Sequence, residues 1–355
     1  MIISEYSVDQ FDELEKIWKE LEQGSEMTCF QTFDWYKILN SHFISEKKKS
    51  AFRKGTYILL SDDSKKPLVI APIEIIKTGF YFGGIGLKKG FYFIGRQGFS
   101  DYLNFIYKEI SFDYLSEIFK YIKTKYNLNY FCFENVSERT GTYSILTELF
   151  SQDKIDSLCM TLPLADDFEL YRKSLSKSTR QNIRTAFNRA EKDNIKFSYE
   201  IRKCIDYETA DKLMAIRAQR LNKKITETNS NLSKKAQLYN FARNTIVNIS
   251  SNPVDVMKEV KDCWCLLAKC NGEIGAFFYS LYKPENKTVY LLLAGVDKKY
   301  EWYSPGVTQL YQFINDEISC GKKNVEYIDM TRGNEKYKYQ LKSHELITSQ
   351  FVFSL

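Results

Sequence analysis

The sequence predicts a mixed α/β fold built from two similar halves, and three observations carry this prediction. The chain has 355 residues, which is too long for one small core and suggests about two domains. Helix-like and strand-like segments follow one another in a similar order in both halves. The last quarter reads as strand, turn, amphipathic helix and strand. We therefore predict one domain over residues 1–160 and a second over 161–355, with the boundary near Leu162-Pro-Leu164.

In the first half, an apolar stripe at helical spacing predicts a helix over residues 9–23. A second helix is expected from Phe30 to about His42. Strands are expected at Gly55–Leu60 and Lys66–Ile76, joined by a polar turn. The remaining elements of this half are a helix over 114–126, a strand over 130–133 and a helix over 142–150.

The second half is expected to begin with a helix from about Phe168, followed by a helix over 207–221. Apolar runs predict the remaining strands of this half, at 264–269, 274–281, 290–295, 325–330 and 346–353.

Between the strands at 290–295 and 325–330, the sequence predicts a helix that starts at a Ser-Pro-Gly turn. Ser304 suits the N-cap, and Pro305 suits the first turn, where a missing N–H costs nothing. Apolar residues at steps of three and four run from Val307 to Ile318, and Gly321 is expected to end the helix.

The start of that helix is the clearest candidate for a phosphate site. Helix N-termini present unpaired N–H groups and the positive end of the helix dipole. We expect the turn at Ser304 and the amides of Gly306, Val307 and Thr308 to bind the phosphates of a donor. The alternative is an ordinary strand–helix–strand unit without a ligand, because such turns are common.

Residues 173–190 are the most basic stretch of the chain, with Lys177, Arg180, Arg184 and Arg189 set around an apolar face. The pattern fits a helix that contacts nucleic acid or a membrane surface. It also fits a solvated face on a packed helix, which is the interpretation we favour from the sequence. The sequence does not choose between tRNA, a nucleotide sugar and plain solvent.

The composition of the chain narrows further the classes of protein to which it can belong. The net charge of +6 fits an anionic ligand but is weak support for nucleic acid. Eight cysteines without a Cys-x-x-Cys pair, together with only two histidines, make a zinc site unlikely and predict free thiols in a reducing cytoplasm. No signal peptide and no membrane-spanning run is visible. No Ser-His-Asp spacing is legible, so covalent catalysis has no support.

The Ser304-Pro-Gly306 turn and the later Asp329-x-x-Arg332-Gly333-x-x-x-Tyr337-Lys338 loop together resemble the acyl-CoA site of the GNAT acyltransferases. The match is closest to the bacterial subgroup related to Fem-type aminoacyltransferases and to acetyltransferases of exopolysaccharide (cellulose-biosynthesis-type) clusters. The resemblance implies tandem GNAT-like domains, with the acyl-CoA site in the second. It also implies that the strands at 290–295 and 325–330 splay apart around the donor thioester.

Acyl transfer from a thioester needs a base, a proton for the leaving thiolate and an N–H donor for the oxyanion. By this resemblance, Asp329 acts as a base or holds the acceptor, Glu335 is a second carboxylate in reach, and Tyr337 donates a proton. The alternative for Asp329 is a strand-end residue capping a turn, and Tyr337 could merely pack.

The same loop supplies the expected contacts to anions. Arg332 can bind an anionic acceptor or the CoA phosphates as a planar fork, and Lys338 as a point charge. Gly333 is expected to adopt a backbone angle that other residues resist.

The resulting hypothesis is an N- or O-acyltransferase that uses acetyl-CoA or another acyl-CoA and no metal. The resemblance suggests a small, anionic acceptor: a sugar, a nucleotide sugar or an amino-acid-like intermediate of envelope or polysaccharide synthesis. Aminoacyl-tRNA as donor ranks second, because residues 222–250 lack the sustained heptads of the long helical hairpin often found in Fem proteins. A scaffold that binds a ligand without catalysis is the third alternative. The acceptor and the oligomeric state stay open.

Overall fold

A computed structural model describes residues 1–44, 53–78, 88–95, 100–150, 154–230, 253–261, 263–322 and 324–354. The chain forms two compact units. Unit 1 contains Met1–Ser157 and Leu346–Leu355, and unit 2 contains Leu158–Gln237 and Asn252–Glu345. The C-terminal segment therefore groups with the N-terminal part of the chain. Assignment of a GNAT-like domain to each of 1–160 and 161–355 stays a prediction.

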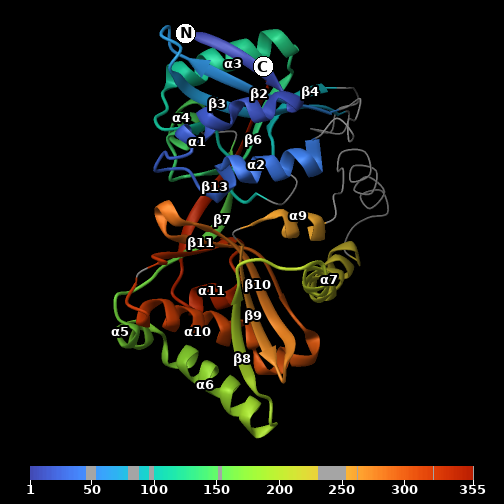
Figure 1. Ribbon diagram of the computed structural model, residues 1–355, viewed down its shortest axis with the longest axis vertical. Coiled ribbons are helices and arrows are strands. Elements are labelled where there is room, and N and C mark those ends of the chain that lie inside the picture. Colours follow the sequence, from blue (N-terminus) through green and yellow to red (C-terminus); the bar gives the residue numbers. More distant parts are fainter. Residues whose placement is uncertain are drawn as a thin grey trace. The chain divides into compact units, whose positions relative to one another are not determined.

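Unit 1 is built on a mixed sheet (Figure 1). Its strands lie in the order β1-β2-β3-β4-β6-β13. Their bounds are β1 Ile2–Ser7, β2 Arg53–Ser61, β3 Pro67–Thr78, β4 Lys88–Phe93, β6 Tyr130–Ser137 and β13 His344–Ser354 (in unit 1 from Leu346), and a short strand β5 (Ile106–Tyr107) pairs with β3. The predicted strands at 55–60, 66–76 and 130–133 are confirmed, whereas β1 and β4 were not predicted.

The helices of unit 1 are α1 (Glu15–Leu21), α2 (Phe33–Leu39), α3 (Phe112–Tyr126) and α4 (Gly141–Phe150). The single helix expected over 9–23 was wrong in its first half, where Val8–Leu14 forms 3-10 turns. Phe11, Leu14 and Trp18 are nonetheless all buried, so the apolar stripe identified the core residues correctly. The helix expected from Phe30 to His42 is also broken, because Cys29–Gln31 is a 3-10 turn and Asn40–Ile44 a π-helical turn.

A carboxylate of unit 1 couples its stability to pH. Glu5 on β1 is mostly buried, which raises its pKa, but hydrogen bonds from Lys125, Tyr126, Thr56 and Tyr121 outweigh burial and lower the pKa to about 2. A carboxyl whose pKa is lower in the folded than in the unfolded chain stabilises the fold above the unfolded value. This stabilisation is lost as pH falls through the folded value.

We therefore expect Glu5→Gln to lower the stability of unit 1 at pH 7 and to have little effect near pH 2. Chemical denaturation at pH values from 7 to 2 gives the free energy of unfolding of the wild type and of Glu5→Gln, and the two are compared at each pH. Glu15→Gln is the matched control, because Glu15 forms an exposed pair with Lys19 on α1 and such pairs contribute little. A stability difference for Glu5→Gln that does not change with pH would contradict the assignment.

Unit 2 contains parallel and antiparallel strands in the order β7-β12-β11-β10-β9-β8. Their bounds are β7 Lys154–Pro163 (in unit 2 from Leu158), β8 Phe197–Arg202, β9 Cys263–Cys270, β10 Glu273–Lys283, β11 Thr288–Val296 and β12 Tyr327–Arg332. β8, β9, β10 and β11 are antiparallel neighbours, and β11 and β12 are parallel. The predicted strands of this half are confirmed, and β7 and β8 are additional.

The helices of unit 2 are α5 (Phe168–Ser174), α6 (Lys177–Lys192), α7 (Tyr207–Ser230), α9 (Pro253–Glu259), α10 (Pro305–Ser319) and α11 (Lys336–Gln340). α10 covers the sheet, and its Leu310, Phe313 and Ile314 are buried against strand residues such as Leu266 and Val289. The helix ends as predicted: Cys320 caps it, and Gly321 adopts a positive φ of 69°.

Two expectations for this half need correction. The helix expected from Phe168 is divided in two, because Leu175 adopts an extended conformation and Ser176 caps a new helix through the Thr179 amide. The terminal loop contains a short helix, α11. The mixed α/β fold class predicted from the sequence is confirmed.

Candidate active site

The strands β11 and β12 are paired only at their beginnings. Thr288, Val289 and Tyr290 are in parallel register with Tyr327, Ile328 and Asp329, and the pairing stops there. β11 continues to Val296 along β10, whereas β12 bends away. Two parallel strands that part in this way leave a slot with unpaired main-chain groups on its walls.

β11 is irregular at the point of parting. In its pairing with β10, Tyr279 opposes Leu293 and Ser280 opposes Leu291, so Leu292 is an extra residue outside the ladder. Such a bulge redirects side chains and is frequent beside functional sites. It also leaves a main-chain N–H group outside the regular β10 ladder.

β12 is also irregular close to the point where the two strands part. Thr331 has a positive φ of 51°, which is costly for a β-branched residue. Two hydrogen bonds hold it there: its amide donates to Asp329 Oδ1 at 2.8 Å, and its hydroxyl donates to the Leu291 carbonyl at 2.9 Å. The second bond joins β12 to β11 across the beginning of the slot.

The ammonium of Lys338 binds main-chain carbonyl groups of the loop that follows β12. Its side chain is only 3% exposed, and its ammonium lies 2.8, 2.9 and 3.0 Å from the carbonyl oxygens of Met330, Arg332 and Gly333. Glu335 is 3.1 Å away as its ionic partner. An ammonium has only three hydrogens, so these groups already saturate it.

The structure confirms the unusual backbone angle predicted for Gly333. Its φ is 103°, and a Cβ added to it would lie 2.6 Å from Glu335 Oε2. Its amide donates to the Leu158 carbonyl on β7. Glycine therefore allows the chain to turn between β12 and α11.

A cavity of about 190 Å³ lies at the parted ends of the two strands. Four of the predicted site residues line it: Arg332, Glu335, Tyr337 and Lys338. The other wall is apolar and consists of Phe278, Leu291, Leu292, Ala294 and Met330, with Thr331 beside them. Asp329 does not line this cavity, and its Oδ1 accepts a hydrogen bond from the Thr331 amide.

Arg217 of α7 also lines this cavity, and sequence analysis missed it. Leu213, one helical turn before it, is fully buried. An arginine four residues after a core leucine lies on the buried face of a helix. That placement of a charge was a signal in the sequence that could have identified it.

The start of α10 differs in detail from the prediction. Ser304 has a left-handed backbone (φ 50°, ψ 45°), and its side chain makes no capping hydrogen bond. The predicted capping role of Ser304 was therefore wrong, because an N-cap side chain reaches the helix amides from an extended backbone. The Thr308 amide is not available to a ligand either, since it donates to the Ser304 carbonyl.

Gly306 and Val307 remain as the predicted phosphate donors. Both precede the first amide that has an intrahelical acceptor. A Cβ on Gly306 would lie 3.3 Å from Val296 Cγ2 and 3.9 Å from Phe278 Cζ. Phe278 also lines the cavity, so the start of α10 adjoins the slot between β11 and β12.

Other sites for chemistry were sought in the described ranges. No group of three or more His, Cys, Asp or Glu residues lies close enough there to hold a metal ion. Cys263 and Cys265 lie at alternate positions of β9 and are buried, and burial raises the pKa of the Cys263 thiol to about 11. No helix in the described part of the chain is long and apolar enough to cross a membrane.

Comparison with known families gives one match. Residues 177–339 match the model of the acetyltransferase (GNAT) domain. The matched range begins with α6 and ends in α11, so it contains the slot, the cavity and the start of α10. No curated protein sequence matches the chain.

Solved structures give weaker similarities. A conserved protein of unknown function from Bacteroides thetaiotaomicron superimposes with a TM-score of 0.53 at 11% identity, over 100% of both chains. FemX gives a TM-score of 0.49 at 13% identity over 100% of this chain and 98% of its own. A tandem GNAT protein from the clavulanic acid biosynthesis pathway gives 0.47 at 8% over 99% and 98%. At these identities the likeness concerns the fold alone.

Residues 177–339 of unit 2 thus match a GNAT acetyltransferase domain, and the chain has a mixed α/β fold. This makes the protein an enzyme of the acyltransferase class.

Proposed function

We propose that this protein transfers an acyl group from acyl-CoA, with acetyl-CoA as the first choice, to the amine or hydroxyl of a small acceptor. The observation that carries the proposal is the parting of β11 and β12 at a cavity lined by Arg332, Glu335 and Tyr337. A thioester placed in this slot would lie beside a carboxylate, a phenol and a cation. The start of α10 next to it would take the donor's phosphates.

The proposed reaction is a direct transfer. The acceptor nitrogen or oxygen attacks the thioester carbonyl carbon, the new C–N or C–O bond forms, and the C–S bond breaks. The acceptor proton leaves to a base, and the CoA thiolate takes up a proton. The negative charge that develops on the carbonyl oxygen is stabilised by an N–H donor.

Within this scheme we assign the base to Glu335 and the proton donor to Tyr337, because both line the cavity. The N–H of the bulged residue Leu292 is the candidate donor to the oxyanion. Asp329 and Lys338 become positioning residues: Asp329 holds the Thr331 amide, and Lys338 holds the loop carbonyls. A direct catalytic role for Asp329 remains the competing prediction.

For the acceptor, the resemblance suggests a sugar, a nucleotide sugar or an amino-acid-like intermediate of envelope or polysaccharide synthesis. Of the three cations that line the cavity, Lys338 is occupied by main-chain carbonyls, and the two arginines, Arg332 and Arg217, support an anionic acceptor. The deciding experiment offers acetyl-CoA, longer acyl-CoAs and aminoacyl-tRNA as donors to a panel of amino sugars, nucleotide sugars and amino acids. Release of the CoA thiol that depends on one acceptor would support the proposal. Transfer only from aminoacyl-tRNA would overturn it.

The phosphate site predicts a specific effect of Val307→Pro. Proline is tolerated in the first helical turn, and it removes the Val307 N–H without removing an intrahelical bond. A hydrogen bond to a charged group contributes about 1.5–3 kcal/mol, so the Kd for acetyl-CoA should rise by roughly one to two orders of magnitude. Isothermal titration calorimetry measures this directly.

Val307→Ala is the control, because it shortens the same side chain and keeps the amide. The far-UV circular dichroism of both variants should match the wild type. Equal affinities for Val307→Pro and Val307→Ala would remove this amide from the donor site. Gly306→Val is a poorer test, since its Cβ alone would already lie 3.3 Å from Val296.

A further inference from the structure

A second and larger cavity lies in unit 2, away from the residues assigned to acyl transfer. Its volume is about 390 Å³, which is within the usual range for small-molecule pockets. It is formed by α5, α6 and α10 and shares no lining residue with the cavity between β11 and β12. Neither the family match nor the proposed reaction gives it a role.

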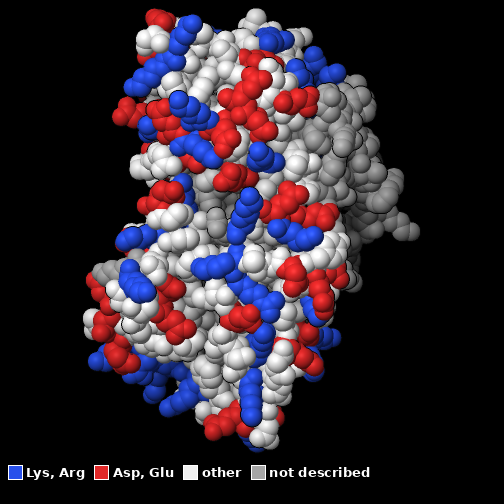
Figure 2. Space-filling model, viewed as in Figure 1, with Lys and Arg blue, Asp and Glu red and all other residues white. Residues whose placement is uncertain are grey.

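The polar part of this cavity is strongly basic. Arg172, Lys177, Arg180 and Arg184 line it, and among its described lining residues none is acidic. Figure 2 shows Lys and Arg side chains gathered on the side of unit 2 that carries α5 and the beginning of α6. Four cations around one concave space repel each other, and an anionic ligand relieves that repulsion.

Two of these cations are already used within the protein. Arg172 is paired with Glu169 on the same helix. Arg180 donates to the carbonyl oxygens of Lys173 and Leu175 at the end of α5, and so joins α5 to α6. These two residues shape the cavity.

The other two are available to a ligand. Lys177 is exposed and has no ionic partner among the described residues, and Arg184 bonds only the neutral amide of Gln181 there. They lie seven residues apart on α6, which is two helical turns and therefore the same face. An ammonium and a guanidinium about 10 Å apart along a helix suit a ligand with more than one phosphate oxygen.

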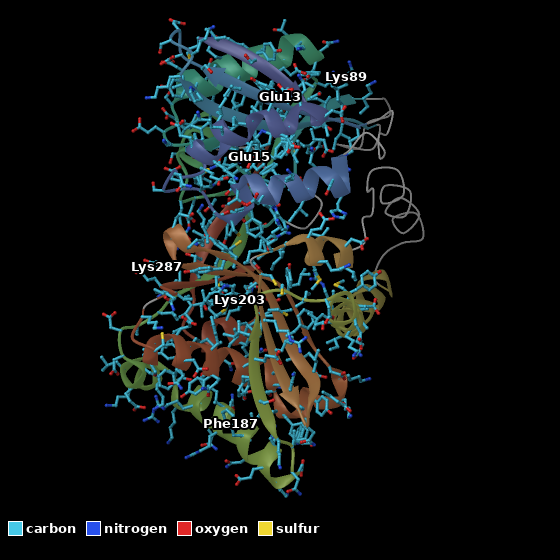
Figure 3. All side chains as sticks on the ribbon, viewed as in Figure 1. Glu13, Glu15, Lys89, Phe187, Lys203 and Lys287 are labelled. Carbon is cyan, nitrogen blue, oxygen red and sulfur yellow. The ribbon has the colours of Figure 1, made fainter. Side chains whose placement is uncertain are left out.

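The remaining wall is aromatic and apolar. Phe187 projects from α6 (Figure 3) and is partly buried against the core of unit 2. Tyr311 of α10 packs edge-on against Phe168 at 5.3 Å and exposes part of its ring to the cavity. Aromatic faces beside basic side chains are the combination that binds nucleotide bases and phosphates together.

We propose that the cavity between α5, α6 and α10 is a nucleotide-binding site, in which Lys177 and Arg184 bind phosphate and Tyr311 contacts the base. The ligand is either a free nucleoside phosphate or a nucleotide at an end of single-stranded RNA, since both present the same groups. The site is distinct from the acyl-transfer cavity, and its occupancy is measured by binding rather than by turnover. Failure of this proposal therefore leaves the proposed acyltransferase function unaffected.

The test measures the affinity of uridine 5′-diphosphate, which lacks the adenosine 3′-phosphate of CoA, by calorimetry and of a 5′-labelled six-nucleotide RNA by fluorescence anisotropy. The variant is Lys177→Gln/Arg184→Gln, and both side chains are exposed, so folding should be retained. We expect the Kd for at least one ligand to rise at least tenfold and the slope of log Kd against log salt concentration to decrease. Tyr311→Leu should raise the same Kd about fivefold or more, whereas Tyr311→Phe should not.

Lys192→Gln/Lys196→Gln is the matched control, since it removes two exposed charges at the far end of α6 and beyond. If both double variants weaken binding equally, the effect is one of net charge and the site is refuted. The same conclusion follows if neither ligand binds the wild type below millimolar concentration. Vesicles of phosphatidylglycerol provide the last arm: binding to them that depends on Lys177 and Arg184, without nucleotide binding, would identify a membrane surface and overturn the proposal.

Discussion

Lys338→Met should destabilise unit 2 by about 3–5 kcal/mol and abolish acyl transfer. Methionine keeps most of the side-chain volume but removes the ammonium, which leaves the Met330, Arg332 and Gly333 carbonyls without their donor and Glu335 without its ionic partner. Each buried acceptor left without a donor costs about 1–3 kcal/mol, and three carbonyls lose theirs, whereas the Glu335 side chain is 38% exposed and adds little to the loss. The free energy of unfolding from urea denaturation gives the value.

The chain contains a suitable control for this experiment. Lys287 and Glu326 form a Lys–Glu pair at 2.7 Å, with both side chains nearly half exposed. Lys287→Met should cost only about 0–1 kcal/mol, because water solvates both partners when the pair is broken. If the two variants unfold at the same urea concentration, the ammonium of Lys338 does not hold the loop. Lys338 would then again be a candidate for binding substrate, as the sequence predicts.

Glu335→Gln should lower kcat by about 10²–10⁴-fold once an acceptor is known, since removal of a general base typically has this effect. Glutamine keeps the size of the side chain, and the loop carbonyls still hold Lys338. The Kd for acyl-CoA should change less than twofold, because the site that we propose for the donor's phosphates lies at the start of α10.

Asp329 provides the competing outcome. Asparagine at 329 can still accept the Thr331 amide through its side-chain oxygen, so a positioning role predicts near-normal kcat for Asp329→Asn and a large loss for Asp329→Ala. A base at this position predicts a large loss for both. If Asp329→Asn is inactive while Glu335→Gln retains wild-type kcat, the base is Asp329 and our assignment is wrong.

Much of this protein could be predicted from its sequence because the relevant signals are local. The apolar stripe from Val307 to Ile318 and the glycine at 321 determine α10, and the alternating apolar runs determine most strands of both units. The spacing of Arg332, Gly333, Glu335, Tyr337 and Lys338 placed these residues in one short loop. The structure confirms that four of them share a cavity.

Other features depended on backbone conformation and packing that the residue types alone do not specify. The left-handed backbone of Ser304 follows from the turn that precedes α10, and it removes the capping role that the residue type predicts. The burial of Lys338 depends on how α11 folds back on the end of β12, so a lysine expected to bind substrate instead holds the main chain. Arg217 reaches the cavity of the candidate active site only because α7 packs beside β11.

The basic helix α6 shows the same difference between what the sequence determines and what the tertiary structure determines. Its sequence determined an amphipathic helix with four basic residues, and it could not distinguish a solvated face from a binding site. Only the tertiary structure placed Lys177 and Arg184 opposite Tyr311 of α10, more than 120 residues later in the chain, around a shared cavity. A local pattern specifies which residues a helix presents, whereas the packing of distant elements decides whether they surround a ligand or face water.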